Sequence, residues 1–179
     1  MTRLHPNESK VPDSLVPPER SLRVLIANET DAAIDADRIE NAVRLAFADG
    51  PYLWVEVSVA VVDDDMIRDL NRQFLNHDYP TDVLSFTLED DPPRLEGEII
   101  VSLDTAVRLA AEAGWPASDE LLLYVVHGAL HLAGHRDKDD EDAALMRSAE
   151  ANLLAQLGVA MSPSDSRWIP NAAQEGQPS

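Results

Sequence analysis

Three histidines in one short stretch carry the clearest chemical signal in this chain. The chain has 5 histidines, and His127, His131 and His135 all fall within HGALHLAGHRD. On a helix, His127 and His131 lie on one face about 6 Å apart along the axis, so their imidazoles can share one metal ion. The spacing therefore predicts a metal site on a helix.

A third ligand is expected from just beyond that helix. Gly134 is a typical helix stop, and a chain reversal there brings residues 135–137 back over the same face. Either His135 or Asp137 can then complete a site with three protein ligands and an open position, as in catalytic zinc sites.

Two alternatives bear on this prediction. The histidines could be hydrogen-bonded core residues, but imidazoles inside an otherwise apolar helix lose solvation, and one metal ion satisfies both. A zinc peptidase is the other alternative. Gly128 stands where the H-E-x-x-H motif has its general-base Glu, so standard peptidase chemistry lacks its base.

The surrounding segments predict one α/β (α+β) domain that positions these histidines. Alternating and β-branched stretches predict strands over 22–28, 53–62, 83–88 and 98–103, with a turn over 89–97. Helical spacing predicts about five helices: 35–50, one that follows Asp63 and buries Ile67, Leu70 and Phe74, one capped by Asp104, one capped by Ser118, and one from 139/140 to 158. The fourth contains LLLYVVHGALHL, which is apolar almost all round and so predicts a central buried helix.

Composition limits the function classes. The chain has 179 residues, 33 acidic against 14 basic side chains and a formal charge of −19, which argues against broad adhesion to nucleic acid or anionic lipid. No apolar run approaches the ~18 residues of a bilayer span. The chain has no Cys, which excludes disulfides, and no secretory signal is visible, so a cytoplasmic location is expected.

The two ends of the chain read as tails. Residues 1–20 and 161–179 are rich in Pro and polar residues and lack hydrophobic periodicity. The folded domain is therefore expected over 21–160.

The segment HGALHL-x-G, together with LNRQFLNHDYPTDVLSF and GEIIVS upstream, resembles the bacterial YbeY family of metal-dependent endoribonucleases. The resemblance runs from about residue 22 to 158. It implies a zincin-like fold, with a four-stranded mixed sheet around a central metal-binding helix. It also implies one Zn²⁺ per chain, held by His127, His131 and Asp137, with His135 as the alternative third ligand. Asp137 replaces the third His of the family pattern H-G-x-L-H-L-x-G-x-D-H, which would make the ion a weaker Lewis acid.

A second motif departs from the family at one position. Leu75 stands where the family has an Arg that the resemblance assigns to the RNA phosphate. We hypothesise that Arg72, on the same helix face, or His77 takes over this contact. Asp82 and Ser85, in TDVLSF, are candidate catalytic residues, with an equally good interpretation as turn and sheet residues.

The resemblance implies a zinc-dependent, single-strand-specific endoribonuclease that acts in ribosomal RNA maturation and ribosome quality control. A metal-activated water would attack the phosphodiester, with ribosomal RNA and the small ribosomal subunit as partners and no role for DNA or membrane. Two alternatives stay open: a metal-dependent hydrolase of small or peptide substrates, and a non-catalytic ribosome-associated module with a structural metal. Given the charge of −19, RNA binding is expected to be weak and salt-sensitive.

Overall fold

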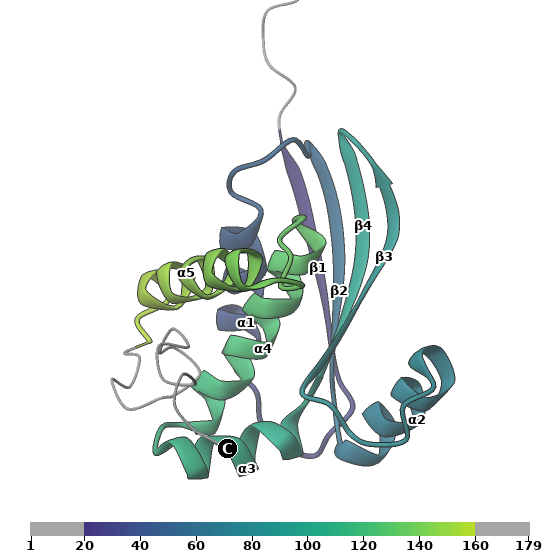
Figure 1. Cartoon of the computed structure of the whole chain (residues 1–179), viewed down its shortest axis with the longest axis vertical. Helices are drawn as coiled ribbons and strands as arrows, with labels where there is room; N and C mark the ends of the chain where they lie inside the picture. Colours follow the sequence, from purple (N-terminus) through teal and green to yellow (C-terminus); the bar gives the residue numbers. More distant parts are fainter. Residues whose placement is uncertain (1–19, 160–179) are drawn as a thin grey trace, which may run out of the picture.

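A mixed sheet forms the centre of the structure, a computed structural model that describes residues 20–159. Its four strands lie in the order β1 (Ser21–Asn28), β2 (Trp54–Val62), β4 (Arg94–Ser102) and β3 (Val83–Asp91). The first three are parallel, and β3 is antiparallel to β4 (Figure 1). The predicted single domain with a four-stranded mixed sheet is confirmed. The predicted tails lie outside the described residues, apart from Arg20.

Five helices cover the two faces of the sheet unequally. They are α1 (Ala36–Ala46), α2 (Asp64–Leu75), α3 (Leu103–Ala113), α4 (Ala117–Leu132) and α5 (Asp140–Gln156). Figure 1 shows α2 on one side of the sheet and the other four helices on the opposite side. Alternation along β4 produces this division, since Ile99 packs in the large core with α4 whereas Ile100 packs with Ile67 of α2.

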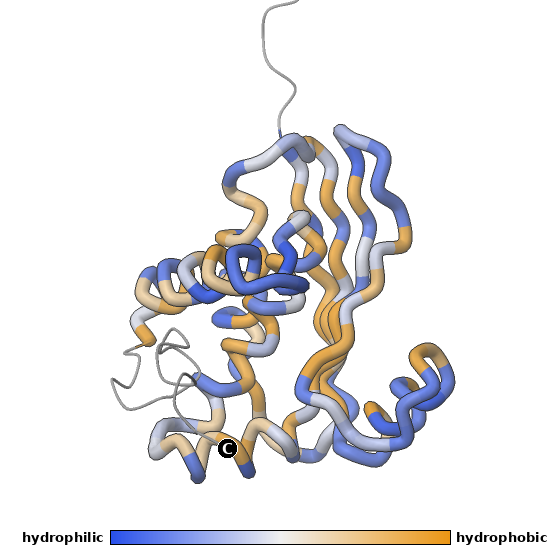
Figure 2. Tube along the Cα trace, in the orientation of Figure 1, coloured by the Kyte–Doolittle hydropathy of each residue, from blue (hydrophilic) through white to orange (hydrophobic). Residues whose placement is uncertain are grey.

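The helix α4 is the centre of the larger layer. Of its 16 residues, 11 are buried, and it contacts α1, α3, α5, β3 and β4. Hydrophobic residues gather along the strands that it faces (Figure 2). The nearly all-apolar sequence of this segment predicted such a buried helix. Within the described residues, no helix has both the length and the apolar character needed to cross a bilayer.

A glycine lets α4 approach the sheet closely. A Cβ built on Gly128 would lie 2.8 Å from Cγ2 of Ile99 and 3.2 Å from Cγ2 of Val83. Ile99 is fully buried and β-branched, so it has little freedom to move away. The absence of a side chain at Gly128 thus sets the distance between the histidine helix and the sheet.

We expect Gly128→Ala to lower the free energy of unfolding by about 1–3 kcal/mol through overpacking. A Gly→Ala change at an exposed helix position would instead raise the free energy of unfolding by roughly 0.5–1 kcal/mol. The sign of the measured change therefore shows whether position 128 is closely packed or exposed. Urea denaturation of the metal-free protein measures the effect. The exposed substitution Ser148→Ala on α5 is the control, with an expected change within about 0.5 kcal/mol. A Gly128→Ala protein as stable as the parent would contradict the close approach.

The predicted turn over 89–97 is wrong. β3 continues to Asp91 and β4 begins at Arg94, so the connection between them is Pro92–Pro93 alone. The acidic residues that suggested a loop lie on an exposed edge strand, where β4 pairs with one side of the backbone and the side chains stay in water.

Three details at helices also differ from the prediction. Ser102, not Asp104, caps α3 by accepting a hydrogen bond from the Thr105 amide at 3.1 Å. The helix α4 begins one residue before Ser118, with Pro116 at its N-cap. Phe74 is 56% exposed rather than buried, because the short helix α2 covers only part of its face of the sheet.

Candidate metal centre

His127 and His131 face each other on α4. Their Nε2 atoms are 3.0 Å apart, and the two rings are close to perpendicular, at 85°. The opposite nitrogen of each ring lies against an oxygen. His127 Nδ1 lies 2.6 Å from Oε1 of Glu150, and His131 Nδ1 lies 3.1 Å from the main-chain oxygen of His135. The contact at Nδ1 therefore holds each ring in its orientation.

These contacts determine which nitrogens can bind a metal. A carbonyl oxygen can only accept, and a carboxylate accepts when ionised, so each Nδ1 is assigned the proton. Both Nε2 atoms then direct lone pairs toward each other, which is unfavourable unless a cation lies between them. Their separation of 3.0 Å is near the ~3.3 Å edge of a tetrahedron with zinc–nitrogen bonds of about 2.05 Å. The donor set fits a metal ion.

Asp137 completes the group. Its Oδ2 lies 3.6 Å from His131 Nε2, and one ligand atom from each of His127, His131 and Asp137 lies within 4.8 Å of the others. The predicted helix stop brings it there. Gly134 adopts a φ of +99°, and the His135 amide donates to the Leu130 carbonyl at 2.9 Å, which reverses the chain.

The structure thus brings Asp137, rather than the His135 side chain, to the two imidazoles. His135 contributes its main-chain oxygen to His131, and the residue lines a separate hollow with Gly134 and Arg136. By position and by geometry, the carboxylate is the better candidate for third ligand.

Glu150 is a site residue that the sequence analysis missed. It lies on α5 in a buried row with Met146 and Leu154, spaced by four, and it is only 6% exposed. An acidic residue in an otherwise apolar row was the available signal. Burial alone would lower the pKa of His127, but the hydrogen bond and charge of Glu150, reinforced by Asp82 and Asp137, raise it above its ordinary value.

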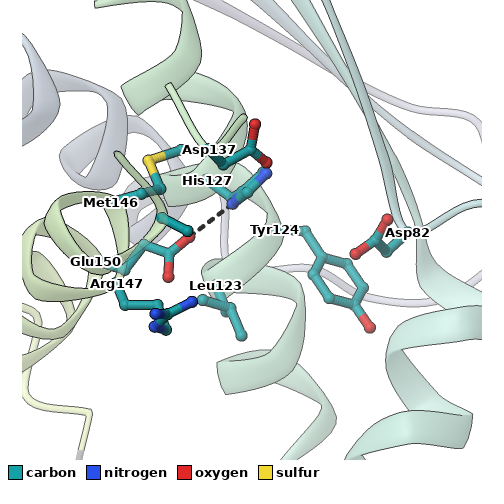
Figure 3. Close-up of a pocket in the computed structure, with 9 residues that line it drawn as sticks. Asp82, Leu123, Tyr124, His127, Asp137, Met146, Arg147 and Glu150 are labelled. Carbon is teal, nitrogen blue, oxygen red and sulfur yellow. Dashed lines mark hydrogen bonds and ion pairs between the residues drawn. The ribbon is translucent and has the colours of Figure 1, made fainter. Parts of the chain in front are cut away.

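A cavity of about 300 Å³ opens beside His127. Its polar lining consists of Asp82, Tyr124, His127, Asp137, Arg147 and Glu150 (Figure 3). In Figure 3, Glu150 and Arg147 come from α5 on one side of His127, while Asp82 lies beyond Tyr124 on the other. A metal held here would face an open space of the size of small-ligand pockets, rather than a closed shell.

Comparison with known proteins identifies the family. Residues 25–158 match the family model described as Endoribonuclease YbeY. The chain belongs to the YbeY family. The predicted resemblance is confirmed, and with it the prediction that the chain is a member of an enzyme family.

Relatives named Endoribonuclease YbeY include a protein of Rhodopirellula baltica, 50% identical over 105 residues, which are 58% of this chain and 54% of that protein. The protein of Carboxydothermus hydrogenoformans is 41% identical over 58% of this chain and 73% of its own length. The chain thus spans about half the length of the Rhodopirellula baltica protein. The solution structure of TM1509 from Thermotoga maritima is similar, with a TM-score of 0.53 and 31% identity over 76% of this chain and 89% of that chain.

The first part of the second motif, where this YbeY chain departs from the family pattern, lies on α2 and in the loop after it and does not line the cavity. Arg72 lies on α2, with ion pairs of 2.6 Å to Asp69 and 3.5 Å to Asp78. His77 stacks on Tyr79, with ring centroids 5.4 Å apart. Neither residue lines the cavity that contains His127. Their role in RNA binding stays a prediction.

The two candidate catalytic residues of the same motif are placed differently. Asp82 lines the cavity, and its Oδ1 accepts hydrogen bonds of 2.9 Å from the Thr81 hydroxyl and the Val83 amide. It therefore closes the turn into β3 and also faces the metal ligands. Ser85 lies on β3 opposite Ile99 and does not line the cavity.

Proposed function

We propose that this chain is a zinc-dependent, single-strand-specific endoribonuclease that acts in ribosomal RNA maturation and ribosome quality control. Ribosomal RNA and the small ribosomal subunit are its proposed partners, in the cytoplasm. The observation that supports this most is the pair of Nε2 atoms 3.0 Å apart, with Asp137 beside them and an open cavity in front. The name carried by the relatives supplies the substrate class.

The residues of the cavity have distinct roles in this proposal. Zn²⁺ held by His127, His131 and Asp137 would act as a Lewis acid toward a phosphoryl oxygen and would make the attacking water more acidic. Glu150 keeps the proton of His127 on Nδ1, so that Nε2 is free to bind the ion. Asp82 faces the same cavity, where its carboxylate can accept a proton from the attacking water.

One observation favours a second candidate. In the described part of the chain, three carboxylates line the cavity, from Asp82, Asp137 and Glu150, against one arginine. Such a lining attracts a cation but repels a polyanion until the metal is bound. Hydrolysis of a small or peptide substrate by the same metal is therefore the alternative function.

The test is cleavage by the metal-loaded protein of four substrates: single-stranded RNA, duplex RNA, single-stranded DNA and a peptide panel. The proposal expects zinc in elemental analysis. It also expects cleavage of single-stranded RNA but not of the other three substrates, and a chelator should abolish this cleavage. Cleavage of peptides without RNA cleavage would favour the alternative. Unfolding of the whole domain on chelation, without cleavage of any substrate, would indicate a structural metal.

A further inference from the structure

Among the residues that the structure describes, Arg147 is the only lysine or arginine that lines the cavity beside His127. It lies on α5, one helical turn before Glu150, and is half-buried. In Figure 3 its side chain extends beside Leu123, on the side of His127 away from Asp137. The cavity therefore has the metal ligands at one end and a guanidinium at the other.

Within residues 20–159, the Arg147 guanidinium forms no ion pair. Arg38, Arg44, Arg68 and Arg72 each form an ion pair with a carboxylate. Arg147 has no such pair and no hydrogen bond to another of the described residues, although the Glu150 carboxylate is close by in the sequence. That carboxylate is bound to His127 instead, at 2.6 Å. A half-buried guanidinium that has no partner among residues 20–159 can bind an anion that enters the cavity.

We propose that Arg147 binds the phosphate next to the one that is cleaved. This inference rests on the proposed endoribonuclease function. A guanidinium can hold two phosphate oxygens at once, which positions the strand as well as attracting it. Because the cavity is about 300 Å³, it has room for little more than one nucleotide between Arg147 and the metal ligands.

The proposal makes substrate length the deciding variable. A dinucleotide has one phosphodiester, which must lie at the metal, so it leaves Arg147 without a contact. A longer strand supplies the second phosphate. We expect Arg147→Ala to raise KM for a single-stranded RNA decamer about tenfold with little change in kcat, and to leave kcat/KM for a dinucleotide unchanged.

A binding measurement tests the same residue without catalysis. Fluorescence anisotropy of a labelled RNA decamer with the chelator-treated protein gives affinity against salt concentration. Loss of one phosphate contact should reduce the slope of log affinity against log salt by about 0.7 for a single strand. We expect this reduction for Arg147→Ala. Arg147→Lys should lose only part of the affinity and keep the salt slope, because lysine keeps the charge but not the planar guanidinium that can hold two oxygens.

Arg44→Ala is the matched control, because Arg44 is also a helix arginine but lies outside the cavity. Unchanged KM and salt slope for Arg44→Ala, with effects for Arg147→Ala, support the proposal. Effects for Arg72→Ala without effects for Arg147→Ala overturn the proposal and favour the contact predicted from the second motif. Equal zinc content and equal melting temperature in all variants exclude an indirect effect through the metal or the fold.

The outcomes separate this inference from the function on which it rests. If the parent protein cleaves RNA and Arg147→Ala matches it in KM and salt slope, the inference fails and the function stands. If the parent cleaves no RNA, the function fails, and an unchanged salt slope in Arg147→Ala would overturn the inference independently. An equal loss on dinucleotide and decamer would also overturn it, since the residue would then act at the cleaved phosphate or through folding.

Discussion

Replacing His127 by Ala is expected to remove the metal and RNA cleavage together. His127 supplies one of only two imidazoles in the ligand group, and the remaining His131 and Asp137 form a two-ligand site that binds Zn²⁺ weakly. Loss of a hydrogen-bond partner of a metal ligand lowers metal affinity about 10–100-fold. Loss of the ligand itself should therefore lower metal affinity by more than about 100-fold. Elemental analysis after dialysis and cleavage of single-stranded RNA measure the two effects.

The third ligand can be assigned by two further variants. Asp137→Ala should lose the metal as His127→Ala does, whereas His135→Ala should keep it, because only the main-chain oxygen of His135 contacts the site. Asp137→His restores the imidazole of the family pattern and should retain zinc. Metal loss in His135→Ala with retention in Asp137→Ala would reassign the ligand to His135.

Replacing Glu150 by Gln is expected to lower zinc affinity about 10–100-fold, although Glu150 touches no metal ligand atom directly. The carboxylate lies 2.6 Å from His127 Nδ1 and fixes both the ring and the position of its proton. An amide fits the same space, but it carries no charge and can present its NH₂ group instead of an acceptor. A competition titration with a zinc chelator measures the affinity.

The same variant has a second expected effect in the metal-free protein. The hydrogen bond and charge of Glu150 raise the pKa of His127, so Glu150→Gln should lower that pKa toward or below its ordinary value. NMR titration of the imidazole measures it. Glu141→Gln, an exposed change on the same helix, is the control and should alter neither quantity. A Glu150→Gln protein with parental zinc affinity would show that the buried carboxylate serves packing alone.

The sequence could predict the parts of the site that depend on local geometry. The i, i+4 spacing of His127 and His131 fixes one helix face, and Gly134 fixes where the chain reverses. Asp137 could be predicted because it is three residues past that reversal. The strands were also predictable from local sequence, because alternation of apolar and polar residues indicates a strand with one buried face.

Residues brought in from elsewhere in the fold were not predictable in this way. Glu150 and Arg147 reach the cavity only because α5 packs across α4, which is a tertiary contact without a local sequence signature. Arg72 shows what a local argument leaves open. It shares a helix face with Leu75, but α2 packs on the other side of the sheet, so Arg72 does not line the cavity and its contact with RNA stays a prediction.

The long β3–β4 hairpin has a consequence for association between molecules. β3 forms an outer edge of the sheet within the described residues, and unpaired edge strands tend to recruit strands from other chains. Here the outer half of β3 carries Glu89, Asp90 and Asp91 in succession, next to an irregularity in register after Thr87. Like charges would face each other if two such edges met, and the bulge breaks the regular ladder that an incoming strand needs. We therefore expect the acidic run that looks like a loop in the sequence to disfavour edge-to-edge association through β3.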